Sequence, residues 1–211
     1  MKQALPRVAV PRLSLYLRCL EELAPGVERI SSERLAELAG VTPAKLRKDL
    51  SYLGSYGVRG VGYHTEHLRY QIRRELGLTR DWPLVIVGMG NLGRALAHYA
   101  GFREQGFRVV GVFDDDPAKV GGRVDDLAVE SLDGLEAAVR ERGASIGVIA
   151  TPPEAAQAVV EMLAASGVAS ILNFAPTVLR VPPSVYVRRV DFSSELQVLA
   201  YYLHRDTAPA G

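Results

Sequence analysis

The sequence predicts an α/β protein in which a winged helix-turn-helix domain precedes a doubly wound, Rossmann-like parallel-sheet domain. Three observations predict this class: an apolar run that leads into G-x-G-x-x-G, a regular alternation of apolar runs with helical segments, and a basic N-terminal segment containing two short helices. We expect the winged-helix domain at residues 1–80, the Rossmann domain at 81–192, and a C-terminal helix and tail at 193–211.

The glycine motif directly follows an apolar run, Leu-Val-Ile-Val, at residues 84–87. We expect Gly88 to permit a tight turn, Gly90 to let a pyrophosphate approach the backbone, and Gly93 to let a helix pack closely on the strand. The first N–H groups of that helix would face the anion. The nucleotide-binding residues predicted from this motif are Gly88, Met89, Gly90, Asn91, Leu92 and Gly93.

A second apolar run ends in Asp114, which follows the last glycine by about the twenty residues that separate these features in dinucleotide sites. A carboxylate there accepts hydrogen bonds from both hydroxyls of the adenine ribose. It also repels a 2′-phosphate, so we expect NAD(H) rather than NADP(H). Asp115 and Asp116 would add to that repulsion; the alternative is that they are solvated carboxylates preceding Pro117.

Strands and helices alternate throughout the second domain, and the strands are almost continuously apolar, which is typical of a parallel sheet covered on both faces. After a hinge at 81–83, we expect strands at 84–87, 108–113, 145–150, 170–173 and 185–190, and helices at 91–104, 133–142 and 154–166. Thr151, Pro152 and Asn173 follow strand ends, where ligands of such sheets bind. We expect them beside the nicotinamide half of the nucleotide, although each could serve only as a strand-end turn.

The two halves of the chain differ in charge. Residues 1–80 carry 14 Lys and Arg against 8 Asp and Glu, whereas residues 81–211 carry 11 against 16. A basic half beside an acidic half indicates that the basic half meets a polyanion. Chance segregation of solvated charge is the alternative.

The basic half contains a helix-turn-helix pattern. We expect helices at 11–23, 34–39, 43–53 and 65–76, with Ser31-Ser32-Glu33 capping the second helix and Thr42 as the N-cap of the third. Leu46, Leu50 and Leu53 should face the core. Positive side chains near a helix N-terminus oppose the helix dipole unless phosphates and base edges lie there, as in a recognition helix. The predicted DNA contacts are Lys45, Arg47, Lys48, Ser51 and Tyr52; an ordinary solvated face is the alternative.

A glycine-rich stretch, residues 54–63, follows the third helix and alternates glycine with Val, Arg and Tyr. We interpret it as a β-wing of two short strands, with Arg59 near the tip and able to enter a narrow minor groove. The glycines could instead serve turns alone.

Several functions are excluded by what the sequence lacks. A single cysteine, Cys19, provides neither a disulfide nor a thiolate cluster, and we expect it to be buried. His64 and His67 have no evident partner ligands, so no metal is expected. The sequence contains neither a secretory signal nor an apolar run approaching 18 residues, which predicts a cytoplasmic protein without a membrane span.

A dehydrogenase needs a proton-transfer group beside the hydride acceptor, and the second half of the chain offers only His98 and His204 as histidines. We therefore expect a protein that binds the cofactor without turning it over. A small NAD-dependent oxidoreductase with an accessory N-terminal domain remains the alternative. A third hypothesis is a CoA- or nucleotide-binding module, but the presence of Asp114 speaks against it.

Residues 44–54, 57–63 and 88–93, in this order, resemble the Rex family of redox-sensing transcriptional repressors, and the resemblance continues through 171–174 and 191–203. It implies a homodimer that binds operator DNA of respiratory and fermentative genes and is released by NADH. It also implies that the C-terminal helix, residues 194–204, is exchanged between subunits, and that two dimer arrangements place the recognition helices differently.

The resemblance further implies a polar link between Arg12 of the first helix and Asp191 before the last helix. Phe192 is then expected to bind the cofactor, near the nicotinamide or the dimer seam. Tyr99 is expected in the same region, as a switch or interface residue.

Overall fold

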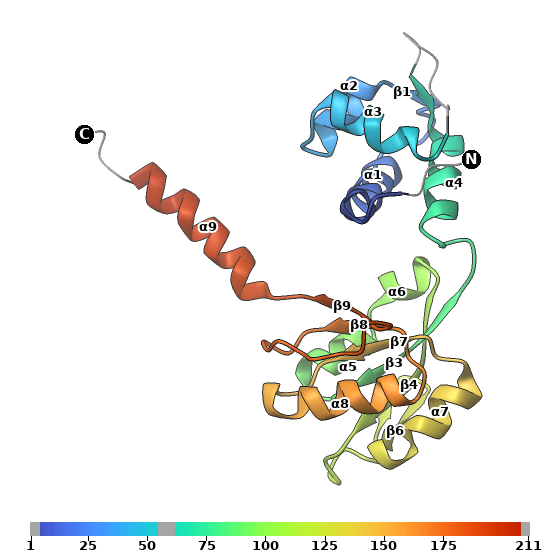
Figure 1. The fold of residues 1–211 in the computed structure, drawn as a ribbon, viewed down its shortest axis with the longest axis vertical. Coiled ribbons are helices and arrows are strands. Elements are labelled where there is room, and N and C mark those ends of the chain that lie inside the picture. The colour runs from blue at the N-terminus through green and yellow to red at the C-terminus, as the bar shows by residue number, and fades with distance from the viewer. Residues whose placement is uncertain (1–4, 55–61, 208–211) are drawn as a thin grey trace. The chain divides into compact units, whose positions relative to one another are not determined.

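The computed structural model describes residues 5–54 and 62–207 of the 211-residue chain. The chain divides into two compact units, residues 1–80 and 81–211, and each is described here by itself. Figure 1 colours the first unit blue to teal and the second green to red.

The first unit is built mainly from helices whose bounds agree closely with the predicted ones. Along the chain its elements are η1 (Arg7–Ala9), α1 (Val10–Glu21), β1 (Arg29–Ile30), α2 (Ser32–Leu38), α3 (Pro43–Ser51), β2 (Tyr63–His64) and α4 (Thr65–Glu75). The Ser31 side chain accepts a hydrogen bond from the N–H of Arg34 at the start of α2, and Thr42 accepts one from Lys45 at the start of α3. The expected helix-turn-helix arrangement is therefore present, with both helices capped as their sequences predict.

The helices of the first unit share one apolar core. Leu46, Leu50 and Leu53 are buried in it, as their spacing predicts, and so is Cys19. The remaining buried members are Leu13, Tyr16, Leu17, Leu20, Ile30, Leu35, Ala36, Ala39, Tyr63, Leu68 and Ile72. Since α3 contributes to this core along one face only, its opposite face is left to solvent.

A short antiparallel pairing of β1 with β2 joins Ile30 to Tyr63 across some 30 residues of sequence, and we did not predict it. Gly62 precedes β2 with a φ of +82°, and a Cβ at this position would lie 2.4 Å from the carbonyl oxygen of Ile30. Glycine is therefore required there. The expected wing tip, including Arg59, lies outside the described residues.

The second unit is an α/β domain. Its elements are β3 (Trp82–Val87), α5 (Asn91–Ala97), α6 (Ala100–Glu104), β4 (Phe107–Asp114), β5 (Arg123–Val124), β6 (Leu127–Ser131), η2 (Leu132–Gly134), α7 (Leu135–Arg142), β7 (Ile146–Ile149), α8 (Pro153–Ala165), β8 (Ser170–Asn173), β9 (Tyr186–Arg189) and α9 (Phe192–Thr207). The described strands form a seven-stranded sheet in the order β5-β6-β4-β3-β7-β8-β9, parallel throughout except for the β5–β6 hairpin. This confirms the predicted doubly wound sheet.

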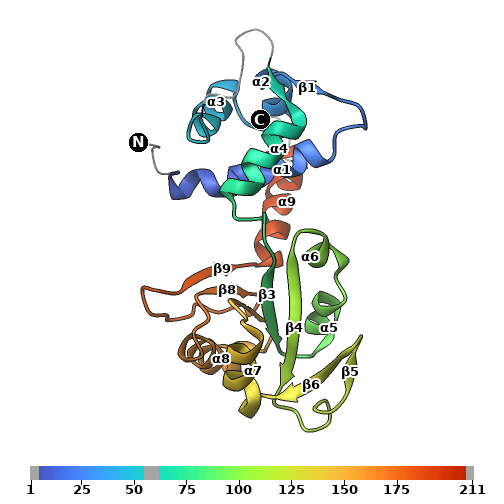
Figure 2. The same cartoon turned by 90° about the vertical axis from the view of Figure 1, so that its right-hand side faces the viewer.

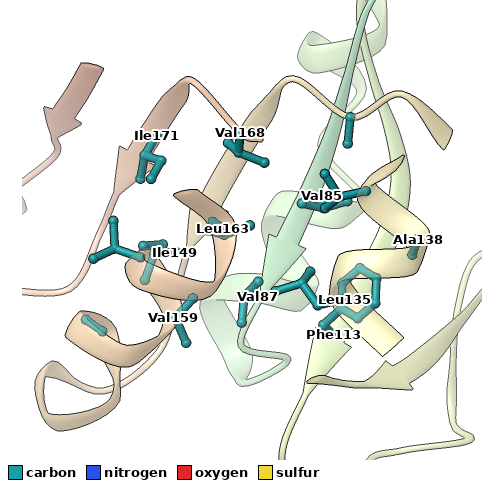
Figure 3. Packing of buried hydrophobic residues seen from close by; sticks show 14 of the residues in the cluster. Val85, Val87, Phe113, Leu135, Ala138, Ile149, Val159, Leu163, Val168 and Ile171 are labelled. Carbon is teal, nitrogen blue, oxygen red and sulfur yellow. The ribbon is translucent and has the colours of Figure 1, made fainter. Parts of the chain in front are cut away.

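Both faces of the sheet are covered, because alternate residues of each strand point to opposite sides. Val85 and Val87 of β3 pack with Phe113 and Ile149 under α7 and α8, as Figure 3 shows. Leu84 and Ile86 of the same strand pack on the other side; the buried residues around them are Met89, Val112, Val124, Val129 and Val148, with Leu96, Ala97 and Phe102 of α5 and α6 against them. Figures 1 and 2 show these helix pairs on either side of the strands.

The chain order places a switch point at the centre of the sheet. From β3 the chain runs outward through β4 to β6, and it then returns to β7 on the other side of β3. The loops that follow β3 and β7 therefore leave in opposite directions. Ligands of open α/β sheets bind in the crevice that this creates.

The expected single helix at 91–104 is wrong, since the structure divides it into α5 and α6. Tyr99 interrupts the helix with an extended backbone, φ −70° and ψ 105°. Its ring lies over Gly101, where an added Cβ would come within 2.6 Å of it, and meets Phe102 edge-on at 5.3 Å between ring centroids. Glycine weakens a continuous helix, and the stacked ring stabilises the break.

Two further boundaries differ from the prediction. Two of the three residues of the expected hinge at 81–83, Trp82 and Pro83, belong to β3, where the Trp82 N–H donates to the carbonyl oxygen of Gly106. The β5–β6 hairpin was not predicted; its tight turn at Asp125, with a φ of +51°, leaves only two residues in β5. Such a short strand gives too little alternation to detect.

The parts of the chain that the structure describes include no helix long and apolar enough to cross a membrane. Within the same ranges, no cluster of His, Cys, Asp or Glu side chains has the makings of a metal site.

Candidate functional sites

The glycine turn after β3 has the geometry that its sequence predicts. Gly88 has a φ of +99°, and a Cβ here would lie 2.7 Å from the backbone of Ala150, which follows β7. At Gly93 a Cβ would lie 1.7 Å from the carbonyl oxygen of Gly88, so this glycine lets α5 pack directly on the turn. A Cβ at Gly90 would meet nothing within 4 Å. Gly88 and Gly93 are therefore required by close backbone packing, whereas Gly90 leaves open space for a ligand.

That space is part of a cavity of about 550 Å³ at the switch point. Loops that follow β3, β4 and β7 surround it, together with the start of α8. Its lining residues are Val87, Gly88, Gly90, Asn91, Leu92, Asp114, Asp115, Asp116, Lys119, Leu132, Ala150, Thr151, Pro152, Ala155 and Val159. The volume falls within the range of small-molecule sites, and the mixture of an apolar floor with a few polar groups is typical of them.

Asp114 ends β4 at the edge of this cavity and is only 4% exposed. Its Oδ2 accepts the N–H of Met89 at 2.6 Å, and its Oδ1 accepts the N–H of Asp116 at 2.9 Å. Burial alone would raise the pKa of Asp114, but these two N–H groups and the ammonium of Lys119 outweigh burial and hold the pKa below its usual value. The carboxylate is therefore ionised and fixed in orientation.

Lys119 is a site residue that we did not predict. Its Nζ lies 3.2 Å from Oδ1 and 3.1 Å from Oδ2 of Asp114, and 3.5 Å from a carboxylate oxygen of Asp116. The sequence offers one indication of this pairing, a single lysine five residues after Asp114. A turn that reverses the chain is needed to bring the two together, and we had not predicted that turn.

Thr151 lies where we predicted, in the cavity wall after β7. Its hydroxyl is buried, and among the described residues it has no hydrogen-bond partner. A buried polar group of this kind is available to a ligand that enters the cavity. Pro152 follows it in the wall and begins the approach to α8.

Four of the predicted nucleotide-binding residues do not line the cavity. The side chain of Met89 is buried in the core on the α5 side of the sheet, and only its N–H serves the site, through Asp114. Gly93 is buried in the packing of α5. Asn173 binds its own turn, donating to Ala175 and Thr177 and accepting from the N–H of Ala175. Phe192 is 61% exposed, with its ring 6.1 Å from that of Phe174.

These features together fit a dinucleotide. No side chain caps the N-terminus of α5, so its first N–H groups remain free of side-chain acceptors beside the open space at Gly90. Asp114 presents a fixed carboxylate at the end of the neighbouring strand. Leu132, Ala155 and Val159 provide an apolar surface on which a flat base can lie.

In the first unit, α3 presents the predicted DNA-contacting residues on its solvent face. Lys45, Arg47, Lys48 and Ser51 are exposed, and Tyr52 at the end of the helix is half-buried. They occupy the arc of the helix opposite Leu46 and Leu50. This surface has the charge and the accessibility that a recognition helix needs in a major groove.

Arg47 already has partners within its own domain. Its Nη1 lies 3.0 Å from the hydroxyl of Ser32 and 3.1 Å from a carboxylate oxygen of Glu33, both at the start of α2. These contacts orient the guanidinium and oppose its charge, so DNA would compete with Glu33 for it. Glu33 was not among the predicted residues, because its contact with Arg47 crosses between two helices.

Asp49, on α3, is 2% exposed, and we did not predict its burial. Arg12 of α1 binds both of its carboxylate oxygens, with Nε 2.5 Å from Oδ2 and Nη2 2.8 Å from Oδ1, and the Tyr16 hydroxyl donates to Oδ2 at 2.9 Å. Burial would raise the pKa of Asp49, but these hydrogen bonds and the charge of Arg12 lower it below the usual value. The pKa of Tyr16 is raised, mainly by burial and in second place by the hydrogen bond to Asp49.

The residues predicted to link the two units are engaged locally. Arg12 uses three of its five N–H groups on Asp49 and the carbonyl oxygen of Val8. Asp191 accepts from Arg189 at 2.6 Å and from the N–H of Ser193 at 3.0 Å. Tyr99 is 60% exposed. The link between Arg12 and Asp191 stays a prediction.

The last helix, α9, exposes an unusual amount of apolar surface. Leu196, Leu199 and Leu203, which follow one another at helical spacing, are each at least 59% exposed. Other exposed apolar or aromatic residues of α9 are Phe192, Val198, Tyr201 and Tyr202. A helix with such a face needs a partner surface.

Comparisons with known proteins bear on both units. Residues 79–177 match the family model described as "CoA binding domain", and residues 4–51 match the one described as "Putative DNA-binding protein N-terminus". The first match describes the Rossmann-like fold that the sheet shows, and the second covers α1 to α3.

Relatives and solved structures match nearly the whole chain. The redox-sensing transcriptional repressor Rex of Streptomyces griseus is 58% identical over 96% of this chain and 81% of its own length. RSP, a Rex-family repressor, has been solved in complex with β-NAD⁺ and operator DNA; that structure is 35% identical, with a TM-score of 0.89 over 97% of this chain and 95% of its own. RSP in complex with β-NADH is 34% identical, with a TM-score of 0.88 over 97% of both chains.

The identity to curated Rex repressors is far above what a shared fold alone would produce, and it extends through both units and the C-terminal helix. It agrees with the family resemblance that the sequence motifs indicate. The chain belongs to the Rex family of redox-sensing transcriptional repressors.

Proposed function

We propose that this protein is a DNA-binding transcriptional repressor that senses the ratio of NADH to NAD⁺ and leaves its operator when NADH binds. One observation carries the proposal: a single chain holds both a dinucleotide cavity with a fixed ribose-binding carboxylate and a capped helix with a basic solvent face. The names of its relatives support a regulator rather than the alternative oxidoreductase. We place it in the cytoplasm, where a bacterial repressor meets DNA.

The nucleotide would be held by groups that the structure has already fixed. Asp114 accepts the hydroxyls of the adenine ribose, the open space at Gly90 admits the pyrophosphate, and the Thr151 hydroxyl gains the partner it lacks among the described residues. The cofactor supplies a ring that is uncharged when reduced and cationic when oxidised. Because a cation loses more hydration free energy than a neutral ring on entering an apolar site, the reduced form is favoured there.

The DNA contacts would be made by α3. Lys45, Arg47 and Lys48 face solvent with Ser51, and their charges neutralise phosphates or reach base edges in the major groove. A symmetric operator places two such helices about one helical turn apart, roughly 34–36 Å. A change in that separation weakens binding without any change in α3 itself.

The dimer would be formed through α9. Its exposed leucines, Leu196, Leu199 and Leu203, form a face that a second copy of the chain can cover. If the two subunits exchange this helix, the α9 of each subunit packs against the other subunit. The link between Arg12 and Asp191 belongs to the same proposal. Arg12 keeps two N–H groups beyond those used on Asp49 and Val8, so the link can form without breaking the pair with Asp49.

The sensing step is a shift between two arrangements of the dimer. NADH binds more tightly to the arrangement that spoils the helix spacing, and DNA binds more tightly to the other. Couplings of this kind are commonly about 1–3 kcal/mol, which corresponds to roughly a 5- to 150-fold change in affinity. A ligand with equal affinity for both arrangements would shift nothing.

The proposal is tested by measuring DNA affinity at one fixed salt concentration over a series of NADH to NAD⁺ ratios. The operator is a duplex that the protein itself selects from random DNA, labelled for fluorescence anisotropy. We expect affinity to fall as the NADH fraction rises, by the roughly 5- to 150-fold that coupling allows. Affinity that does not change with the ratio would contradict the proposal, and steady consumption of NADH with a small substrate would favour the oxidoreductase instead.

A further inference from the structure

Lys119 lines the proposed nucleotide cavity beside Asp114. Recognition of a ribose by a carboxylate accounts for Asp114 but not for a lysine bound to it. Its ammonium lies against both oxygens of the Asp114 carboxylate, at 3.2 and 3.1 Å, and its side chain, which lines the cavity, is 34% exposed. The pairing raises the pKa of Lys119, through its hydrogen bond to Asp114 in the first place, so the ammonium is charged. A positive charge thus stands where we expected acids alone.

The turn after β4 places this lysine firmly. The carbonyl oxygen of Asp116 accepts the N–H groups of Lys119 and Val120 at 2.9 and 3.1 Å. The Asp116 carboxylate accepts the N–H of Ala118 at 2.9 Å. Because Asp116 also donates its own N–H to Asp114, one residue fixes the turn, the lysine backbone and the acid together.

The acceptor capacity of Asp114 is limited. An ionised carboxylate offers about four lone-pair positions, and the N–H groups of Met89 and Asp116 use two of them. Two remain, which is the number that the hydroxyls of a ribose diol require. In the structure Lys119 covers both, so a bound ribose must share Asp114 with the ammonium or turn it toward Asp116, 3.5 Å away.

The consequence depends on the 2′ substituent. A 2′-hydroxyl donates to Asp114, and the displaced ammonium gains no anionic group at the ribose. A 2′-phosphate is repelled by Asp114 and Asp116, yet it accepts a charge-assisted hydrogen bond from the same ammonium. The two side chains therefore act in opposite directions on the choice between NADH and NADPH.

We propose that Lys119 is a second specificity-determining residue of the nucleotide site: its ammonium, held by Asp114 in the free protein, weakens the exclusion of a 2′-phosphorylated dinucleotide. The inference rests on the proposed nucleotide-binding function and deepens it. It implies that the turn at residues 114–116 tolerates NADP(H) better than its three aspartates alone would. It also implies that, once Asp114 is neutralised, the ammonium of Lys119 is free to bind a 2′-phosphate.

The test compares NADH and NADPH binding, measured by nucleotide fluorescence, across full-length variants. Lys119→Met removes the charge and keeps the length of the side chain, and Lys119→Arg keeps the charge. Asp114→Ser neutralises the acid and leaves room for a phosphate, and it is examined with and without Lys119→Met. Arg123→Met, on β5 and outside the cavity lining, is the matched control for loss of one positive charge.

The readout is the ratio of the NADPH to the NADH dissociation constant, which a general loss of stability would not move. We expect Lys119→Met to raise this ratio about ten-fold or more, as the loss of one charge-assisted hydrogen bond predicts. Lys119→Arg and Arg123→Met should leave the ratio near that of the wild type. Asp114→Ser should lower the ratio, and adding Lys119→Met to Asp114→Ser should raise it again.

The role of Lys119 is tested twice, by Lys119→Met in the wild-type protein and by Lys119→Met in the Asp114→Ser variant. The second comparison serves if wild-type NADPH binding is too weak to measure, and the first serves if Asp114→Ser does not fold. A ratio that Lys119→Met leaves unchanged overturns the inference. Failure of the wild-type protein to bind NADH is a different result, which overturns the proposed function instead.

Discussion

Among the described residues, each unit of the protein buries one aspartate, and the two differ in what holds them. Asp49 on α3 is 2% exposed and Asp114 at the end of β4 is 4% exposed, and in both the pKa lies below its usual value. Asp49 is bound by side chains of another helix, Arg12 and Tyr16 of α1. Asp114 is bound by two backbone N–H groups and by Lys119, which lines the cavity wall.

The comparison separates a structural joint from a binding site. The donors on Asp49 come from within the core of the first unit, so the carboxylate fixes the angle between α1 and α3 and has nothing to offer a ligand. At Asp114 only the backbone donors are permanent, and the third donor can be replaced by a ribose. Burial and a lowered pKa are therefore common to both roles, and the source of the donors distinguishes them.

The largest effect is expected from Asp49→Ala. Removing this carboxylate leaves the Arg12 guanidinium and the buried Tyr16 hydroxyl without their acceptor. We expect a loss of about 2–4 kcal/mol in the free energy of unfolding of the first unit, since the 23% exposure of the Arg12 side chain moderates the cost. Urea unfolding followed by circular dichroism measures it.

Asp115→Ala is the control for Asp49→Ala, because Asp115 is exposed and its loss should change the free energy of unfolding by less than about 0.5 kcal/mol. If Asp49→Ala unfolds no more easily than this control, Asp49 is not a structural joint and the comparison fails on that side.

Asp114→Ala should act on binding. The variant loses both acceptors for the ribose hydroxyls, and we expect NADH affinity to fall about 30-fold or more, measured by nucleotide fluorescence. DNA binding by the ligand-free protein should persist, because α3 lies in the other unit. Loss of both activities would show that Asp114 is needed for folding, as Asp49 is, and the distinction between the two aspartates would disappear.

Arg47→Ala tests the surface that Asp49 orients. A bidentate contact to a base is worth about 1–3 kcal/mol of discrimination, so operator affinity should fall while affinity for random DNA falls less. Competition anisotropy with operator and random duplexes measures both. Equal loss on the two duplexes would mean that Arg47 contacts only phosphate.

The smallest effect concerns pH. The folded-state pKa values of Asp49 and Asp114 are lowered, so their contribution to stability is complete above the unfolded value of about 3.9 and is lost as pH falls through the lower folded-state values. Unfolding free energies measured from about pH 6 to about pH 3 should fall less steeply in Asp49→Asn than in the wild type. Identical slopes would show that Asp49 gains nothing from its partners.

The sequence was sufficient for features that depend on local pattern. The leucines of α3, the caps at Ser31 and Thr42, the glycine turn at Gly88 and the acid at the end of β4 all follow from spacing and residue type, and the structure places each as its pattern predicts. The alternation of apolar strands with helices was enough to predict a parallel sheet, because strands buried on both faces cannot be polar.

Features that depend on distant contacts, or on a turn or break in the chain, escaped prediction. Asp49 lies at the edge of the apolar face of α3, and its partner Arg12 is 37 residues away, so nothing local marks it as buried. Lys119 meets Asp114 only through a turn fixed by Asp116. The break at Tyr99 depends on a ring lying over Gly101, and the pairing of β1 with β2 on a two-residue ladder.

The central claim is that one molecule couples NADH binding to DNA binding, and the most direct test is the reciprocal one. Coupling free energy acts equally in both directions, so saturating operator DNA must weaken NADH binding by the same factor by which saturating NADH weakens operator binding. Titration of NADH fluorescence with and without the operator duplex gives the first factor, and anisotropy gives the second. The account predicts two equal factors of roughly 5 to 150; an NADH affinity that the operator leaves unchanged would contradict it.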